Sequence, residues 1–193
     1  MQRCGWVTQD SLYIAYHDRE WGLAQTDKRA LFEMICLEGQ QAGLSWITVL
    51  KKRDNYRRAF YDFDPQQIAL MDEQDLARLL QDSGLIRHRG KLAAIISNAR
   101  AFLAMEAQGE DFARFVWHFV GNQPIVHRYA DYKAAPTTTE KAVALSKALR
   151  LRGFKFVGPT ICYSFMQACG LVSDHQTNCF CHPDNLSTPE TEK

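Results

Sequence analysis

Apolar residues recur at helical spacing along most of the chain, and no run alternates apolar and polar residues as a half-buried strand does. The clearest helical segment follows Asp27, a residue type that commonly caps helices. Four residues of this segment have the i, i+3, i+4, i+7 spacing that places them on one helical face: Leu31, Met34, Ile35 and Glu38. The pattern predicts an all-α fold in which Glu38 points inward with its apolar neighbours.

Further helices are expected after residue 60. They are a short helix that begins at Pro65, a second that ends at Gly84, a long helix within 88–106, a helix within 141–153 and another within 161–170. The second short helix, the long helix and the helix within 161–170 show an apolar stripe on one face, and a Pro, Thr or Gly marks a boundary of the other expected helices and of 161–170. Helices thus account for most of the expected core.

The length of 193 residues allows one well-buried core but not several independent domains. We expect a single helical domain over 1–183, with the polar stretch 127–140 as a surface connection. Residues 184–193 are polar and are expected to form a frayed tail. Apolar residues make up 46% of the chain, which is typical of a globular protein.

The chain has 23 Lys and Arg and 22 Asp and Glu, so its net charge gives no sign of a nucleic-acid partner. Any DNA-binding surface must therefore be local. The N-terminal residues lack the apolar centre of a signal peptide, and no apolar run approaches the roughly 18 residues of a membrane span. We expect a cytoplasmic protein with no membrane partner, and nothing in the sequence demands more than a monomer. In a reducing cytosol the six cysteines are expected as thiols or metal ligands.

The segment 147–170, KALRLRGFKFVGPTICYSFMQACG, combines a tight turn with positive charge. Gly158 precedes Pro159, so the turn leaves backbone N–H groups free at the start of a helix, where they can hold an anion. Nearby positive charges are Lys147, Arg150, Arg152 and Lys155. This combination suits a DNA phosphate. The alternative is an ordinary turn between two helices with a solvated basic rim.

Two Cys and two His near the ends of the chain have the composition of a metal site. The four residues are Cys4, His17, His175 and Cys179. The last two stand at i, i+4, which predicts one helical face. Two Cys and two His complete a tetrahedral zinc site without a position for water, so the ion would be structural and would clip the chain ends together. Cys181 and His182 compete for the C-terminal role, and a core histidine with free thiols is the alternative.

Aromatic residues gather in sequence around Glu38. They are Trp6, Tyr13, Tyr16, Trp21 and Trp46. Such a set forms either a core or the walls of a pocket that stacks on a flat ligand. A buried carboxylate needs a partner, and a cationic or N–H-bearing heterocycle would supply one, which favours the pocket.

Several segments together carry a family resemblance. They are RCGWV (3–7), YIAYHDREWG (13–22), LFEMICLEGQQAGLSWITVLKKR (31–53), IRHRGK (86–91), RGFKFVGPTICYSFMQACGLVSDH (152–175) and Cys179. In this order they resemble the 3-methyladenine DNA glycosylase I family, within the helix-hairpin-helix DNA glycosylase superfamily, over residues 3 to about 182. The resemblance implies a helix-hairpin-helix DNA glycosylase-like fold, with that motif at about 141–170.

The resemblance also implies roles for individual residues. Cys4, His17, His175 and Cys179 match the family's structural site for one zinc ion. Glu38, Tyr16 and Trp46 match its base pocket, with Tyr13, Trp6 and Trp21 as wall residues. The hairpin, with Phe156, Gly158 and Thr160, matches its phosphate contact, and Leu44 beside Gly43 matches its apolar wedge.

Departures from the wider superfamily bear on the chemistry. Bifunctional relatives place a nucleophilic Lys just after the hairpin Gly, where this chain has Pro159 and Thr160, so no lyase step is expected. Many relatives use an Asp after the second hairpin helix. Asp174 lies near that place, but this family is regarded as lacking the catalytic Asp, and we do not assign it that role.

The implied activity is excision of 3-methyladenine from alkylated double-stranded DNA, with release of the free base and an abasic site left behind. Glu38 would accept a hydrogen bond from the flipped base. Two alternatives belong to other classes: a zinc-clipped module that binds DNA without cutting it, and a zinc hydrolase with an open coordination position.

Overall fold

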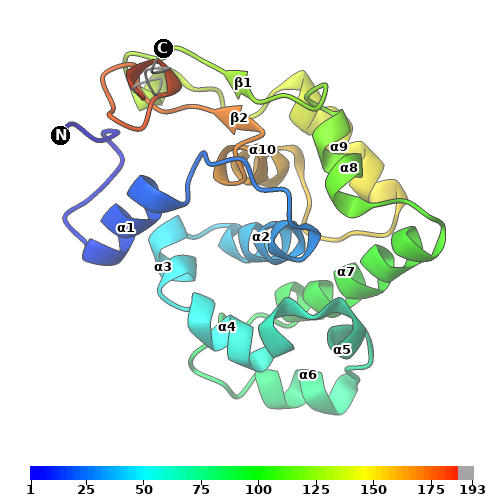
Figure 1. Ribbon diagram of the computed structural model, residues 1–193. Helices are drawn as coiled ribbons and strands as arrows, with labels where there is room; N and C mark the ends of the chain where they lie inside the picture. The colour runs from blue at the N-terminus through cyan, green and yellow to red at the C-terminus, as the bar shows by residue number, and fades with distance from the viewer. Residues whose placement is uncertain (187–193) are drawn as a thin grey trace, which may run out of the picture.

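The computed structural model describes residues 1–186, and helices dominate it (Figure 1). The α-helices are α1 Ser11–Arg19, α2 Lys28–Gln41, α3 Trp46–Leu50, α4 Arg53–Ala59, α5 Pro65–Ala69, α6 Glu73–Leu79, α7 Arg89–Ala107, α8 Phe112–His118, α9 Glu140–Leu151 and α10 Pro159–Ala168. Short 3₁₀ helices are η1 Tyr61–Phe63, η2 Tyr132–Ala134 and η3 Pro183–Asn185. The prediction of a mainly helical fold is confirmed.

The prediction that the chain has no strands is wrong in one detail. β1 (Ile125–Val126) and β2 (Val172–Ser173) form a parallel pair in which Ile125 faces Val172. Each strand is two residues long, too short for an alternating pattern to show in the sequence. The pair joins the first half of the connection between α8 and α9 to the segment after α10 (Figure 1).

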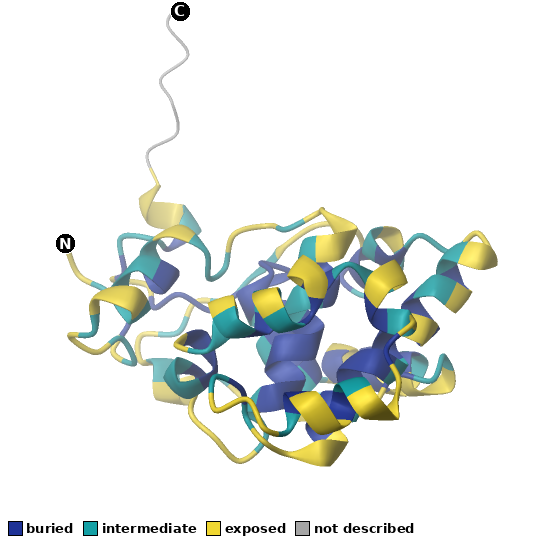
Figure 2. Ribbon diagram, turned by 90° about the horizontal axis from the view of Figure 1, so that it is seen from below, coloured by how far each residue is buried: buried dark blue, intermediate teal, exposed yellow. Residues whose placement is uncertain are grey.

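Helix α2 runs through the middle of the molecule and packs against α7 and α10. The Asp27 side chain accepts a hydrogen bond from the Ala30 N–H at 2.8 Å, as expected of an N-cap. Leu31, Ile35 and Glu38 are all buried on this helix. In Figure 2 the buried residues form the centre of the molecule, and exposed residues cover the outer helices.

Helix boundaries agree with the sequence where a capping residue marks them. Pro65 opens α5, and the Thr139 side chain caps α9. The expected end of the second short helix at Gly84 is wrong, because α6 ends at Leu79. The Asp82 side chain accepts the Gly84 N–H at 2.7 Å, which places Gly84 in a separate turn.

The expected polar tail, 184–193, extends past the described residues, and 187–193 lie outside them. The first part of this stretch lies in η3, where the Arg128 guanidinium pairs with Asp184 at 2.8 Å. Among the helices of residues 1–186, none combines the length and the apolar character needed to cross a membrane.

Candidate functional site

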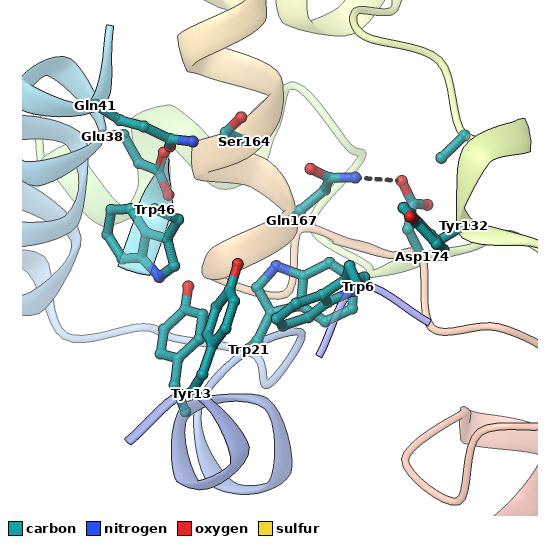
Figure 3. A pocket seen from close by; sticks show the side chains of 12 residues that line it. Trp6, Tyr13, Trp21, Glu38, Gln41, Trp46, Tyr132, Ser164, Gln167 and Asp174 are labelled. Carbon is teal, nitrogen blue, oxygen red and sulfur yellow. Dashed lines mark hydrogen bonds between the residues drawn. The ribbon is translucent and has the colours of Figure 1, made fainter. Parts of the chain in front are cut away.

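A cavity of about 220 Å³ lies where α1, α2, α3 and α10 meet (Figure 3). Its lining residues are Trp6, Tyr13, Tyr16, Trp21, Glu38, Gln41, Trp46, Tyr132, Ala135, Ser164, Gln167 and Asp174. Ligand clefts for drug-sized molecules start at roughly 300 Å³. The smaller cavity matches one planar heterocycle.

Glu38 lies in the last turn of α2 and points into the cavity (Figure 3). Its side chain is buried, and among the described residues its Oε2 atom has no hydrogen-bond partner. The Nε1 atom of Trp46, also buried on this wall, likewise lacks one within residues 1–186. Burial raises the pKa of the Glu38 carboxyl to about 8. The cavity therefore offers an unpartnered acceptor and an unpartnered donor to a ligand.

Aromatic rings form the rest of the cavity wall. The rings of Tyr16 and Trp46 lie 5.5 Å apart at 45°. Trp6 lies 5.0 Å from both Tyr13 and Trp21. The structure thus brings all five predicted aromatic residues to the same cavity as Glu38. Tilted ring pairs of this kind present flat faces on which a planar ligand can stack.

Half of the cavity wall was not predicted from the sequence. The unpredicted residues are Gln41, Tyr132, Ala135, Ser164, Gln167 and, as a wall residue, Asp174. Gln41 stands three residues after Glu38, and Ser164 and Gln167 are three apart on α10, so helical spacing could have indicated them. Tyr132 and Ala135 belong to the 127–140 connection, where no periodicity exists to indicate an inward side chain.

Asp174 lines the cavity, but both of its carboxylate oxygens are engaged. The Tyr163 hydroxyl donates to Oδ2 at 2.6 Å. The Gln167 amide donates to the same atom at 2.8 Å (Figure 3). The Nδ1 atom of His127 lies 2.6 Å from Oδ1. A carboxylate held in this way joins α10 to the 127–140 connection.

Gly43 and Leu44 form an exposed turn just after α2. The Leu44 N–H donates to the Gln41 carbonyl at 2.6 Å, and the dihedral angles of Ala42 (φ −45°, ψ 116°) with Gly43 (φ +76°) are those of a type II turn. A positive φ at this position favours glycine. Leu44 is 42% exposed, which places an apolar side chain on the surface beside the cavity.

The hairpin between α9 and α10 lies against α2 close to Glu38. A Cβ atom on Gly39 would come within 3.1 Å of the Phe156 carbonyl oxygen, so the absence of a side chain at Gly39 lets the hairpin approach. Phe156 has a φ of +53° and is 37% exposed. Gly158 precedes α10 without a side-chain cap, so the backbone N–H groups of Thr160 and Ile161, in the first turn, have no helical partners.

The four predicted metal ligands meet in one buried cluster, the Cys–His cluster: Cys4, His17, His175 and Cys179. Sγ of Cys4 lies 3.5 Å from Nδ1 of His175, and Sγ of Cys179 lies 3.4 Å from Nε2 of His17. The cluster therefore joins the segment before α1 and α1 itself to the segment after β2.

The chain shares its pattern with known proteins along nearly its whole length. The model of the methyladenine glycosylase family matches residues 6–182. The DNA-3-methyladenine glycosylase 1 of Escherichia coli (strain K12) is 65% identical over 185 residues, which are 96% of this chain and 99% of that protein. This chain belongs to the methyladenine glycosylase family. The resemblance noted in the sequence is confirmed.

Solved structures of the family share its fold. A crystal structure of 3-methyladenine DNA glycosylase I superposes with a TM-score of 0.94 at 69% identity, covering 94% of this chain and all of that one. A second, from Staphylococcus aureus, describes the structural basis of 3-methyladenine recognition and matches with a TM-score of 0.90 at 41% identity, covering 95% and 97% of the two chains. The match fits the helical fold predicted from the sequence.

The geometry of the Cys–His cluster in this family member fits a zinc ion. Neighbouring donors of a tetrahedral site, with Zn–S near 2.3 Å and Zn–N near 2.0 Å, lie roughly 3.5 Å apart. The third close pair, Cys179 Sγ and His175 Nδ1, is separated by 3.7 Å. Burial raises the pKa of the Cys4 thiol, so a thiolate there needs a cation beside it.

The sequence argument for the C-terminal pair was wrong in its geometry. His175 and Cys179 do not share a helical face but face each other across a turn, in which the Cys179 N–H donates to the Gln176 carbonyl at 2.8 Å. Of the competing residues, His182 uses both ring nitrogens, toward the His127 carbonyl and the Asp184 N–H. Cys181 lies beside His17 and Asp18 in a second possible ligand group.

Proposed function

We propose that this protein hydrolyses the N-glycosidic bond of 3-methyladenine in alkylated double-stranded DNA and releases the free base. The observation that carries the proposal is the buried Glu38 carboxyl, whose Oε2 atom has no partner in the described residues and faces an aromatic cavity. Two relatives, described above, are named for this activity or for recognition of this base.

The charge of the lesion matches the cavity. In alkylated DNA the 3-methyladenine ring is cationic, so the base leaves as a neutral molecule and its glycosidic bond is weak. A cation stacked on Trp46 and Tyr16 gains about 0.5–2 kcal/mol from the ring faces. Glu38 would accept a hydrogen bond from an N–H of the base, and the positive charge would favour the ionised carboxylate over the protonated form.

The base must leave the duplex to reach this cavity. Leu44, exposed on the type II turn after α2, would fill the gap left by the flipped nucleotide. The free N–H groups after Gly158 would hold a backbone phosphate, and the Arg150 guanidinium lies beside that turn.

Water would complete the reaction by attacking the anomeric carbon as the sugar develops oxocarbenium character. A monofunctional outcome follows from the hairpin, because Pro159 and Thr160 replace the nucleophilic Lys of bifunctional enzymes. Without an amine nucleophile no Schiff base forms, and the product is an abasic site. We propose that the protein acts in the cytoplasm as a monomer.

The Cys–His cluster would hold one zinc ion. Four protein donors leave no position for water, so the ion would contribute stability and not activate a nucleophile. Its effect on the cavity is indirect, since Trp6 and Trp21 belong to the segments that carry Cys4 and His17. Prolonged chelation should lower the melting temperature before it changes turnover.

The deciding experiment is incubation of the purified protein with methylated duplex DNA, with and without brief EDTA treatment, and identification of free bases by chromatography. We expect release of 3-methyladenine with little 7-methylguanine, unaffected by EDTA. Folded protein that binds DNA but releases no base would support the DNA-binding module instead. For the zinc-hydrolase alternative, metal analysis of Cys179→Ser is decisive, because a structural ion is lost together with stability.

A further inference from the structure

Lys91 is a buried lysine that the proposed chemistry does not use. It lies in the first turn of α7, and only 6% of the residue is exposed. Its Nζ atom donates to the Gln40 carbonyl at 2.8 Å and to the Ala42 carbonyl at 2.6 Å. Both acceptors are backbone groups at the end of α2, so the ammonium sits where the helix leaves carbonyls without helical partners.

The same end of α2 carries the exposed turn. The Gln41 carbonyl accepts the Leu44 N–H, and the carbonyls on either side of it accept Lys91. Three successive carbonyls are therefore satisfied, two by one side chain. The turn that presents Leu44 is fixed on its inner side by a group from another helix.

A second set of hydrogen bonds reinforces this contact. The Gln40 amide donates to the Lys91 carbonyl at 3.0 Å, and the Tyr56 hydroxyl donates to the Gln40 amide oxygen at 3.1 Å. The Tyr56 hydroxyl in turn accepts the Ile86 N–H at 3.1 Å. The end of α2 and the start of α7 are thus joined by a buried polar network of hydrogen bonds to backbone groups and one between the Tyr56 and Gln40 side chains.

Helix α7 holds the hairpin in the same way two turns further on. The Asn98 side chain accepts the Lys155 N–H at 2.7 Å and donates to the Lys155 carbonyl at 3.2 Å. Lys91 and Asn98 stand seven residues apart, on the same face of α7. One rigid helix therefore contacts both segments assigned to DNA, the 42–45 loop and the hairpin.

We propose that Lys91 is a positioning residue that fixes the 42–45 loop relative to the hairpin, so that Leu44 meets the duplex while the hairpin holds its phosphate. The inference rests on the proposed function of these segments. Lys91 has a second effect, because the end of α2 carries partial negative charge and would face a polyanion. A buried ammonium at that end offsets this charge.

The test compares Lys91→Met with a matched control on the same helix. Arg100 also donates to two carbonyls at the end of a helix, those of Ala69 at 3.0 Å and Met71 at 2.8 Å after α5, away from the 42–45 loop. Arg100→Met therefore removes the same kind of contact elsewhere. For wild type and both variants, the affinities for a duplex with an abasic analogue and for free 3-methyladenine are measured, together with the melting temperature.

We expect Lys91→Met to weaken duplex binding by at least about tenfold, because two charge-assisted hydrogen bonds are lost. Free 3-methyladenine should bind within about twofold of wild type, since Lys91 does not line the cavity. Arg100→Met should change neither affinity. If Lys91→Met does not fold, Lys91→Gln, whose amide still donates one hydrogen bond, takes its place in the same comparison.

Two results would overturn the inference: duplex binding no weaker than in Arg100→Met, or an equal loss of affinity for duplex and free base, which would mean that Lys91 acts through the fold of the cavity. Failure of the proposed function is separate. It would show in the wild-type protein, as no base release and no preference for the abasic analogue, before any variant is compared.

Discussion

Two carboxylates line the cavity, and their surroundings are opposite. Asp174 has a hydroxyl, an amide and an imidazole nitrogen within 2.8 Å of its oxygens. Glu38 is equally buried, yet its Oε2 atom has no partner in the part of the chain that the structure describes. A buried polar atom without a partner costs free energy, and this cost is recovered only when a ligand supplies the missing group.

The contrast distinguishes a carboxylate engaged within the protein from one whose oxygen is left open to a ligand. By the resemblance noted in the sequence, Asp174 stands near the position of the catalytic Asp of many helix-hairpin-helix glycosylases, but its oxygens are already engaged by Tyr163, Gln167 and His127. Glu38 stabilises nothing in the free protein. Substitutions at the two positions should therefore affect different quantities.

The largest expected effect is on catalysis. Glu38→Ala should lower kcat/KM on methylated DNA by about 1,000-fold, roughly 4 kcal/mol, because the base loses its acceptor. The melting temperature should not fall, since the buried Oε2 atom has no partner among the described residues and its burial costs free energy. Steady-state base release and thermal unfolding of the same preparations measure both quantities. A large loss of thermal stability with unchanged turnover per folded molecule would assign Glu38 to the fold.

The pH dependence of the free energy of unfolding should also show the titration of the Glu38 carboxyl. Its pKa is about 8 in the folded protein and near 4.5 when unfolded, so between these values the unfolded chain binds fewer protons and stability falls as pH rises. At about 1.36 kcal/mol per unit, the free energy of unfolding of wild type should fall relative to Glu38→Gln by roughly 3 kcal/mol between pH 5 and pH 8. Parallel urea-unfolding curves would contradict the burial argument.

For Asp174 the expected effect is on stability. Asp174→Ala leaves the Tyr163 hydroxyl, the Gln167 amide and the His127 ring without their acceptor, and should lower the free energy of unfolding by about 2–3 kcal/mol. Turnover per folded molecule should stay within about tenfold of wild type. Urea unfolding and active-site-normalised assays measure these quantities. The reverse pattern would make Asp174 a catalytic residue.

The smallest expected effects come from removing one hydrogen-bond donor beside each carboxylate. Tyr163→Phe removes one of the donors to Asp174 and should cost about 1 kcal/mol of stability without a change in base release. Trp46→Phe removes an N–H that has no partner among the described residues, so its stability cost should be smaller while base binding weakens. Thermal unfolding with binding of free 3-methyladenine distinguishes the two, and equal stability losses would remove the contrast.

The sequence predicted the inward direction of Glu38 because α2 is long, regular and capped by Asp27. It also predicted the composition of the Cys–His cluster, since metal-ligating residue types can be recognised without knowing how the chain runs between them. The predicted helical geometry of the C-terminal pair was wrong. His175 and Cys179 meet across a turn, which follows a two-residue strand that no periodicity reveals. Local sequence patterns predict helices but do not predict which distant segments pair.

The wall formed by Tyr132 and Ala135 shows the same limit. These residues lie in a connection that reads as polar surface, and they line the cavity only because β1 and β2 pair and Tyr129 bridges Gln176 nearby. The role of Lys91 was equally hidden, since its acceptors are backbone carbonyls 49 and 51 positions away in the chain. Side chains that bind backbone groups leave no mark on the sequence of the segment they hold.

The contact between Cys4 and His175 spans 171 positions, so its two halves are made at opposite ends of synthesis. The Trp21 ring, whose centroid lies 4.6 Å from that of His175, gains this neighbour only when the residues after β2 have been synthesised. A nascent chain that stops early therefore presents an incomplete cavity. The order of synthesis therefore delays completion of the cavity, whose wall includes Asp174, until nearly the whole polypeptide exists.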